Sequence, residues 1–332
     1  MGVWADNSQT ILDAVQRVPS LPWSLRIILD GQGNDTGFAA LRGRIESTDT
    51  EVFNSVAATH RIIGMMQWWG FPLPHYSYAG ERYEVTPDRP LEDPWDRPEI
   101  QACEAWCYCT REPERFLPPD RPRFFISHSD FVDTDGIWEL AHGRGRPAPV
   151  AKRWDVICMF SGHWYDEIQK NWSLAKTCIE TLAADEGLSV LLLSRGGIPD
   201  VPRHPNVEVR PRLAWEDCIR SIARSRLTLV GSHLDPSPRV ITESLALDVP
   251  VLVHSQILGG WKYVAPETGA FFESEYDVGT EALACMAAQL HPRPWLRRRY
   301  GRDRAARRFA GFLRGLGGAD HLEYAIPTAL FR

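Results

Sequence analysis

The sequence predicts an α/β fold, in which a mostly parallel sheet is covered by helices on both faces. From residue 154 onward, short apolar runs of strand length alternate with longer stretches of helical periodicity. This alternation is typical of βαβ units. The chain has 332 residues, which favours about two domains. We therefore expect two α/β domains, of which the second is the better defined.

The elements of the second half follow one another in regular order. The helix expected at Asn171–Ala183 carries an apolar stripe that includes Trp172 and Leu182. A second amphipathic helix is expected at Ala214–Ala223. Strands are expected at 156–162, 189–193, 204–209, 227–230 and 251–253.

The most informative segment is Ser225–Phe272. An apolar strand leads into a loop rich in Gly, Asp and Pro, and a helix then opens at Ser237-Pro238. Ser237 is a good N-cap, and Pro238 suits the first helical position. The first backbone N–H groups of a helix are unpaired, and the helix dipole favours anions there. This segment therefore predicts a site for a phosphorylated ligand.

Arg239 occupies the first turn of that helix, where an acid would normally be preferred. A cation at this place costs a few tenths of a kcal/mol to about 1 kcal/mol. The cost is explained if an anion lies between the cation and the helix. The alternative is that Arg239 points into solvent or pairs with Asp235, and both interpretations stay open.

A family resemblance is carried by the motifs around this helix. Asp235 and Glu243 are separated by seven residues, and the step Asp248-Val249-Pro250-Val251 follows. Gly259-Gly260 and the strand entry Glu267–Phe272 come next. With these motifs, residues 154–290 resemble the nucleotide-binding domain of the retaining "group 1" GT-B glycosyltransferases. That family usually has Glu where Asp235 stands. The resemblance implies a GT-B architecture, with two Rossmann-like domains facing a cleft.

The resemblance implies transfer of a sugar from a nucleoside-diphosphate sugar, with retention and without a metal or other cofactor. Lys170, Arg239 and the N–H groups after Ser237 would stabilise the departing diphosphate. Glu243 would bind the ribose hydroxyls, and Asp235 would bind hydroxyls of the transferred sugar. The alternative for Glu243 is a helix-surface acid paired with a nearby Arg. The remaining donor-side candidates are Gly259 and Gly260 (through backbone N–H groups), Lys262, Arg195, and His163 where the family has Arg.

The first half is less informative. Its expected strands are 25–30, 61–66 and 123–127, its expected helices are 10–18 and 98–106, and residues 71–98 form a long irregular excursion. Gly33, in a glycine loop after the first strand, and His128, after the last, are acceptor-side candidates. An ordinary turn explains Gly33 equally well. The acceptor is expected to be a glycan, a lipid or a protein.

The expected organisation is an acceptor-side domain at 1–132, a linker at 133–152, a donor domain at 153–315 and a tail at 316–332 that crosses back to the first domain. Residues 293–314 are rich in Arg with interleaved aromatics. They can form a basic amphipathic helix on anionic lipid. They can also form a helix that packs on the donor domain and leads back toward the first, which we favour.

Composition limits the function further. The net charge of −6 gives no general case for nucleic-acid binding. No apolar run is long enough for a membrane span, and the N-terminus lacks the apolar region of a signal peptide. We therefore expect a cytoplasmic protein, with peripheral membrane contact as the alternative. Four of the seven cysteines fall on apolar faces of expected elements and are expected to be buried, reduced thiols: Cys158, Cys178, Cys218 and Cys285. Cys103, Cys107 and Cys109 lack the paired spacing of a zinc ribbon, and a metal site there stays an alternative.

Two other functions stay open. One is a metal-dependent transferase that uses Asp133-Thr134-Asp135 as an Asp-x-Asp motif. The other is a non-catalytic module that binds a nucleotide sugar.

Overall fold

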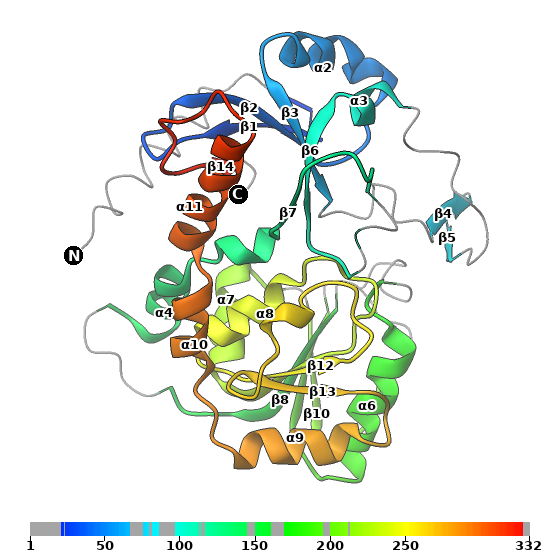
Figure 1. Ribbon diagram of the computed structural model, residues 1–332. Coiled ribbons are helices and arrows are strands. Elements are labelled where there is room, and N and C mark those ends of the chain that lie inside the picture. The colour runs from blue at the N-terminus through cyan, green and yellow to red at the C-terminus, as the bar shows by residue number, and fades with distance from the viewer. Residues whose placement is uncertain are drawn as a thin grey trace. The chain divides into compact units, whose positions relative to one another are not determined.

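The computed structural model describes residues 21–22, 24–66, 76–79, 82–85, 97–111, 113, 117–144, 150–160, 169–194, 200–211 and 213–327. The chain forms two units. Unit 1 comprises Met1–Ala79, Glu84–Phe131 and Arg302–Arg332, and unit 2 comprises Gly80–Tyr83 and Val132–Gly301. Each unit contains a six-stranded sheet with helices against it (Figure 1).

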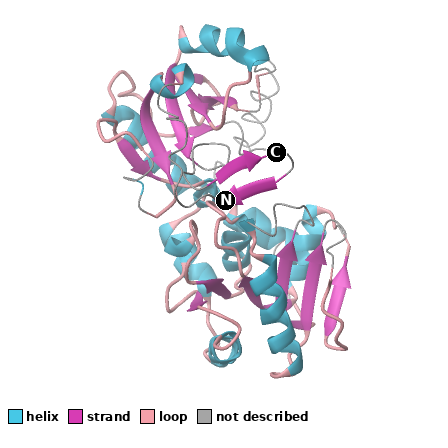
Figure 2. Ribbon diagram, turned by 90° about the vertical axis from the view of Figure 1, so that its right-hand side faces the viewer, coloured by secondary structure: helices cyan, strands magenta, loops and turns pink. Residues whose placement is uncertain are grey.

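The sheet of unit 2 is parallel throughout, in the order β10-β9-β8-β11-β12-β13. Its strands are β8 (Trp154–Phe160), β9 (Val190–Ser194), β10 (Val207–Arg210), β11 (Ser225–Val230), β12 (Val251–His254) and β13 (Gly269–Phe272). Its helices are α4 (Thr134–His142), α6 (Trp172–Ala184), α7 (Trp215–Ala223), α8 (Arg239–Ala246), α9 (Val278–Ala287) and α10 (Pro292–Arg299), with a short 3-10 turn η5 (Trp261–Tyr263). Figure 2 shows the strands side by side with helices beside the sheet.

Both faces of this sheet are apolar, as a parallel sheet requires. Successive side chains of a strand point to opposite faces. Val156 and Cys158 therefore belong to the core beneath α6 and α9, whereas Ile157 belongs to the core beneath α4, α7, α8 and α10. The expected layering of unit 2 is confirmed.

Unit 1 has a mixed sheet in the order β14-β1-β2-β3-β6-β7, in which β1 is antiparallel to both neighbours and the remaining pairs are parallel. Its strands are β1 (Leu25–Leu29), β2 (Asp35–Leu41), β3 (Arg61–Met66), β6 (Cys103–Tyr108), β7 (Arg123–Phe125) and β14 (Ile326–Pro327). Its helical segments are η1 (Ser47–Asp49), α2 (Thr50–Ala57), α3 (Pro98–Gln101), η4 (His128–Phe131) and α11 (Arg302–Gly315). A separate two-stranded sheet pairs β4 (Tyr76–Ala79) with β5 (Arg82–Val85).

One expected element of the first half is corrected, and another is not tested. The helix expected at Pro98–Trp106 ends at Gln101, and Cys103–Tyr108 forms a strand. That strand pairs with β3 and β7, and Cys103, Ala105, Trp106 and Cys107 are buried in it. Sheet pairing therefore outweighs the helical periodicity of this stretch. The helix expected at Thr10–Val18 lies outside the described residues.

The stretch expected to be a linker contains helix α4, because Asp133 caps its amino end. The Asp133 carboxylate accepts the Gly136 N–H at 2.9 Å. A cap of this kind satisfies a backbone donor that would otherwise be unpaired.

The chain also re-enters unit 1 earlier than expected, at Arg302 rather than at 316. The apolar face of α11 is buried in the core of unit 1, through Ala305, Ala306, Phe309, Ala310 and Leu313. Helix α10 instead buries Trp295 and Leu296 in unit 2. Because these apolar side chains are used inside the protein, they do not form a lipid-binding face. Within the described residues, none of the helices combines the length and the apolar character that a bilayer crossing needs.

The seven cysteines are free thiols, and all but Cys218 are buried. Burial raises the pKa of the Cys103 and Cys107 thiols well above the ordinary value. These thiols are therefore protonated and behave as small apolar side chains.

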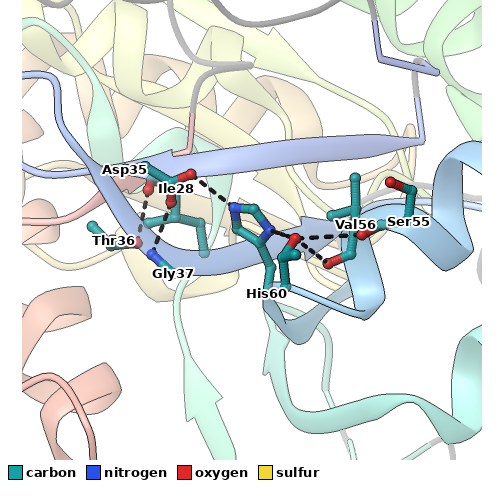
Figure 3. A network of polar contacts seen from close by, with 8 residues as sticks. Ile28, Asp35, Thr36, Gly37, Ser55, Val56 and His60 are labelled. Carbon is teal, nitrogen blue, oxygen red and sulfur yellow. Dashed lines mark hydrogen bonds and ion pairs between the residues drawn. The ribbon is translucent and has the colours of Figure 1, made fainter.

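A polar network joins β2 to the turn before β3 in unit 1 (Figure 3). His60 Nε2 lies 2.7 Å from Asp35 Oδ2, and His60 Nδ1 lies 2.8 Å from the Thr59 hydroxyl. The other Asp35 oxygen accepts the Gly37 N–H, and Thr36 donates to the Ile28 carbonyl. The network lies at the amino ends of β2 and β3, whereas open α/β sheets bind ligands at the carboxyl ends. We therefore assign it to holding the strand register.

Candidate functional site

The candidate site lies at the carboxyl ends of β11 and β12 in unit 2. The chain order of the strands reverses between β8 and β11, and open α/β sheets bind ligands at such a switch point. The loop after β11 spans residues 231–238, and the loop after β12 spans residues 255–260. These loops, the segment just before α6 and the start of α8 supply the predicted donor-side residues that the structure describes, except Lys262, which lies in η5.

Asp235 is the centre of this arrangement. Its side chain is buried, and Oδ2 forms an ion pair with the ammonium of Lys170. Its Oδ1 accepts the backbone N–H of Ser237 at 3.1 Å. Its backbone carbonyl accepts the Gly259 N–H at 3.0 Å. Asp235 thus joins the loop after β11 to the start of α6 and to the loop after β12.

Neighbouring backbone bonds reinforce these connections. Leu234 donates its N–H to the carbonyl of Gln169 at 3.3 Å, just before Lys170. Leu258 donates to the carbonyl of His233 at 2.7 Å. The loop after β11 is therefore held from two sides, which fixes where its side chains point.

Gly259 and Gly260 allow the two loops to approach closely. A Cβ at Gly259 would lie 1.8 Å from the carbonyl oxygen of Pro236. A Cβ at Gly260 would lie 2.6 Å from the Pro238 ring, and Gly260 has a φ of +82°. The predicted role of the Gly259 N–H also meets a competitor. This N–H donates to the Asp235 carbonyl at 3.0 Å, so a bond to the transferred sugar would have to share or replace that one.

The start of α8 also differs from expectation. The helix begins at Arg239, with Pro238 at the N-cap position and no side-chain hydrogen bond there. The prediction that Ser237 is the N-cap is therefore wrong by one position. The backbone N–H of Ser237 instead completes a turn with Asp235. Among the described residues, the N-cap position of α8 thus supplies no side-chain cap, and a helix amino end favours anions.

Glu243 lies one turn further along α8, with its side chain 13% exposed. Its Oε1 accepts the indole N–H of Trp215 at 3.0 Å, and Arg239 Nη2 lies 3.7 Å from the same oxygen. Glu243 therefore has the Arg partner of the alternative interpretation, although the partner is Arg239 on its own helix. Arg239 is about half exposed.

Three residues of this region were not singled out as site candidates from the sequence. One is Trp215, which the sequence could have indicated as a large aromatic residue at the first position of an amphipathic helix. The others are His233, which follows β11, and His254, which ends the adjacent parallel strand β12. The Nδ1 atoms of both imidazoles are buried and have no hydrogen-bond partner among the residues that the structure describes.

The charge of one imidazole affects the pKa of the other. Burial lowers the pKa of His233 below its ordinary value, and the positive form of His254 lowers it further. Burial likewise lowers the pKa of His254, against a backbone hydrogen bond of Glu273 that raises it. Both rings are therefore neutral at physiological pH, and a neutral imidazole can accept a proton or a hydrogen bond.

Of the remaining predicted donor-side residues, the structure describes Lys262, which lies in η5 near two tyrosine rings. The Lys262 ammonium lies 5.1 Å from the ring centre of Tyr263 and 5.7 Å from that of Tyr300. His163 and Arg195 lie outside the described residues.

The two acceptor-side candidates belong to unit 1. Gly33, with a φ of +80°, lies in the hairpin between β1 and β2 and donates to the Asp30 carbonyl at 3.2 Å. The ordinary turn is therefore a sufficient explanation for its glycine. His128 begins η4.

The Asp-x-Asp segment serves other purposes. Asp133 caps α4, and Asp135 pairs with Arg293 at 2.7 Å and Arg297 at 3.3 Å. Across the part of the chain that the structure describes, no group of three or more His, Cys, Asp or Glu side chains is arranged to hold a metal ion.

Comparison with known proteins gives a consistent picture of the fold. No family model matches the sequence, and no curated protein matches it. Solved structures do match. The pneumococcal O-GlcNAc transferase GtfA, in complex with UDP and GlcNAc, superposes with a TM-score of 0.53 at 12% identity, over 83% of this chain and 56% of that one.

Two further structures extend the comparison. TarM superposes with a TM-score of 0.55 at 10% identity, over 79% of this chain and 52% of TarM. Sucrose-phosphate synthase of Thermosynechococcus elongatus superposes with a TM-score of 0.53 at 12% identity, over 78% of this chain and 68% of the synthase. The chain thus spans about half the length of GtfA and TarM. At these identities the likeness establishes the fold: the chain has the α/β fold of GT-B glycosyltransferases, with two Rossmann-like domains.

Proposed function

We propose that this protein is a glycosyltransferase that moves a sugar from a nucleoside-diphosphate sugar to a glycan, lipid or protein acceptor. The observation that carries the proposal is the convergence of four charged groups near the start of α8. Asp235 and Lys170 meet in the loop after β11, and Arg239 and Glu243 meet on the first two turns of the helix. The fold shared with transferases that act on sugars supports the same conclusion.

The chemistry assigned to these groups concerns the leaving group. Transfer breaks the bond between the anomeric carbon of the sugar and a phosphate oxygen, and the departing diphosphate gains negative charge. The Lys170 ammonium, the Arg239 guanidinium and the uncapped amino end of α8 are the groups that would stabilise this charge. Substrate phosphates would compete with Asp235 for Lys170, so the ion pair has to rearrange or share its proton donors during binding.

The carboxylates would position the rest of the donor. Glu243 Oε1 is engaged by Trp215 and Arg239, which leaves Oε2 to accept ribose hydroxyls. Asp235 would accept hydroxyls of the transferred sugar through lone pairs that its present partners do not use. We further propose that the reaction retains the anomeric configuration and does not require a metal ion, with a hexose or pentose as the transferred sugar.

The experiment is a turnover assay with a panel of nucleotide sugars, with and without EDTA. Lys170→Ala or Arg239→Ala should lower turnover by roughly tenfold to a thousandfold, the scale for one charge-stabilising group. Glu243→Ala should mainly weaken nucleotide affinity. If both cation variants turn over like wild type, the phosphate assignment is wrong. Proton NMR of the first-formed product reports whether the configuration is retained, and a loss of activity with EDTA would contradict metal independence.

A second candidate is a non-catalytic module that binds a nucleotide sugar. The Lys170–Asp235 ion pair favours it, because each group partly neutralises the other in this structure. Slow hydrolysis of a nucleotide sugar without acceptor, abolished by Lys170→Ala, would decide against this candidate.

A further inference from the structure

We propose that His233 and His254 form a pH-sensitive pair that keeps the loop after β11 and the loop after β12 together only while both rings are neutral. Acidification then loosens the two loops and weakens nucleotide binding. The effect on nucleotide binding rests on the proposed function, whereas the effect on the loops does not. Both histidines lie in unit 2.

The two histidines lie at the same edge of the sheet. Strands β11 and β12 are adjacent and parallel, with Val230 opposite Val253. His254 is the last residue of β12, and His233 is the third residue after β11. His254 is buried, and its ring centre lies 5.6 Å from that of Phe272 on β13. Both imidazoles are thus placed where the two loops of the candidate site leave the sheet.

The ring nitrogens explain why the neutral forms are required. The Nδ1 atoms of His233 and His254 are buried, and neither has a hydrogen-bond partner among the described residues. In a neutral imidazole one nitrogen carries no proton, and Nδ1 can be that nitrogen. A protonated imidazole carries N–H groups on both nitrogens. Protonation therefore places a donor and a positive charge where the described residues offer no acceptor, and burying such a group is costly.

The acids near His254 do not remove this cost. Glu273 and Asp277, on the segment between β13 and α9, raise the pKa of His254, but burial outweighs them and the pKa is lowered. The Asp277 carboxylate is also engaged elsewhere, since it accepts the N–H groups of Glu273 at 2.9 Å and Ser274 at 2.8 Å. His254 is therefore held neutral in spite of two neighbouring carboxylates.

The surroundings of His233 add to the effect. Burial lowers the pKa of His233, and the positive form of His254 lowers it further. The loop of His233 also contacts the segment before α6, through a backbone bond to the Gln169 carbonyl. The charged residue next to that carbonyl is Lys170, whose ammonium is paired with Asp235. A proton on either ring thus makes a proton on the other less favourable.

Backbone hydrogen bonds connect the rings to the site. The carbonyl of His233 accepts the Leu258 N–H at 2.7 Å. Two residues further on, the Asp235 carbonyl accepts the Gly259 N–H at 3.0 Å. The loop after β12, residues 255–260, has no charged side chain that could neutralise a charge on either ring. A shift of His233 that exposes a protonated ring to water therefore breaks the contact between the loops and displaces Asp235.

The direction of the pH effect follows from the lowered pKa values. The closed loops keep the rings neutral, whereas open loops let them titrate near their ordinary value of 6.5. The open form therefore binds more protons as the pH falls below 6.5, and the closed form is progressively lost. One extra proton shifts this equilibrium by at most about tenfold per pH unit, and two protons shift it by at most about a hundredfold.

The first measurement is amide hydrogen exchange of the protein without ligand at pH 7.5 and pH 5.5. Protection factors are compared, so that the pH dependence of intrinsic exchange cancels. In wild type we expect the protection of Leu258 and Gly259 to fall at pH 5.5 by up to about tenfold, and by more if both rings titrate. In the His233→Gln/His254→Gln variant the protection of these amides should be the same at both pH values.

The second measurement is the affinity for UDP at the same two pH values, by calorimetry. Because the UDP phosphate itself titrates in this range, wild type and the double variant are compared at equal pH. We expect the ratio of their affinities to shift against wild type on acidification, by up to about tenfold for one titrating ring. The matched control is His291→Gln, which changes an exposed histidine of unit 2 and should keep the wild-type pH profile.

The outcomes separate this inference from the proposed function. Wild type that binds no nucleotide at either pH overturns the proposed function, and the exchange measurement still decides whether the loops respond to pH. Equal protection of Leu258 and Gly259 at pH 7.5 and pH 5.5 in wild type overturns the inference, even if the double variant does not fold. An affinity ratio that favours wild type on acidification also overturns it, because the protonated rings would then attract the phosphates instead of separating the loops.

Discussion

Replacing Gly259 by Ala tests the close packing of the loops on which the site is built. The added Cβ would lie 1.8 Å from the Pro236 carbonyl oxygen, whereas real Cβ atoms essentially never approach closer than 3.0 Å. The loops must therefore separate by at least 1.2 Å (3.0 − 1.8). The contact is backbone rather than a flexible side chain, so no rotamer change relieves it.

The magnitude follows from what the separation breaks. The bond from the Gly259 N–H to the Asp235 carbonyl is 3.0 Å long, and a shift of this size removes it. A lost hydrogen bond costs about 1 kcal/mol, and forcing extra atoms into a packed region costs about 1–3 kcal/mol. We expect Gly259→Ala to lower the free energy of unfolding by about 2–4 kcal/mol and to weaken nucleotide binding, because Asp235 moves with the loop.

The assay is thermal denaturation followed by circular dichroism, where a loss of this size lowers Tm by roughly 4–16 °C. The matched control is Gly311→Ala in α11, where a Cβ meets only Arg314 at 3.8 Å. Alanine at that helical position should be neutral or stabilise by up to about 1 kcal/mol. If Gly259→Ala melts at the wild-type temperature, the loops are not packed as described and the reasoning fails.

Three further predictions concern single interactions. Lys170→Ala should lower the free energy of unfolding by about 1–3 kcal/mol, which lies between the values for exposed and buried ion pairs. In a double-mutant cycle followed by urea unfolding, most of that loss should vanish when Asp235→Asn is also present. Purely additive losses would contradict the ion pair. The pKa of His254 is lower in the folded protein than its ordinary value of 6.5, so the unfolded chain binds the extra proton first and stability falls as pH drops through that value. His254→Gln should make the fall of Tm between pH 7.5 and 5 smaller, while His233, whose pKa is also lowered, keeps part of it; an unchanged pH profile would refute this. Asp133→Ala should lower the free energy of unfolding, measured by chemical denaturation, by about 1 kcal/mol because it removes the cap of α4. The response of turnover to EDTA should be the same as in wild type, and a changed response would restore the Asp-x-Asp hypothesis.

Local patterns were sufficient to predict most of unit 2. The nearly continuous apolar run in strands such as Trp154–Phe160 and the apolar stripe of α6 predict a sheet covered on both faces, and the structure has that layering. The helix start expected at Ser237-Pro238 likewise places Asp235 in the preceding loop and Glu243 on the helix. These features depend on neighbours in sequence, which is why sequence reasoning finds them.

Long-range partners were not predictable in this way. Lys170 and Asp235 pair across 65 residues, and Trp215 bonds Glu243 across 28. The helical pattern of Pro98–Trp106 gave the wrong structure for β6, because pairing with two neighbouring strands overrides a weak local preference. Gly259 was assigned to a ligand, whereas its lack of a side chain is required by the Pro236 carbonyl.

The most direct test of the account is amide hydrogen exchange with and without UDP. If the diphosphate binds at the amino end of α8, amides of residues 237–243 should exchange more slowly in the complex. Arg239→Ala should reduce that protection at equal UDP concentration. The Asp35–His60 region of unit 1 should show no change, because it lies at the amino ends of its strands. Binding of UDP with unchanged exchange at 237–243 and protection elsewhere would contradict the central claim.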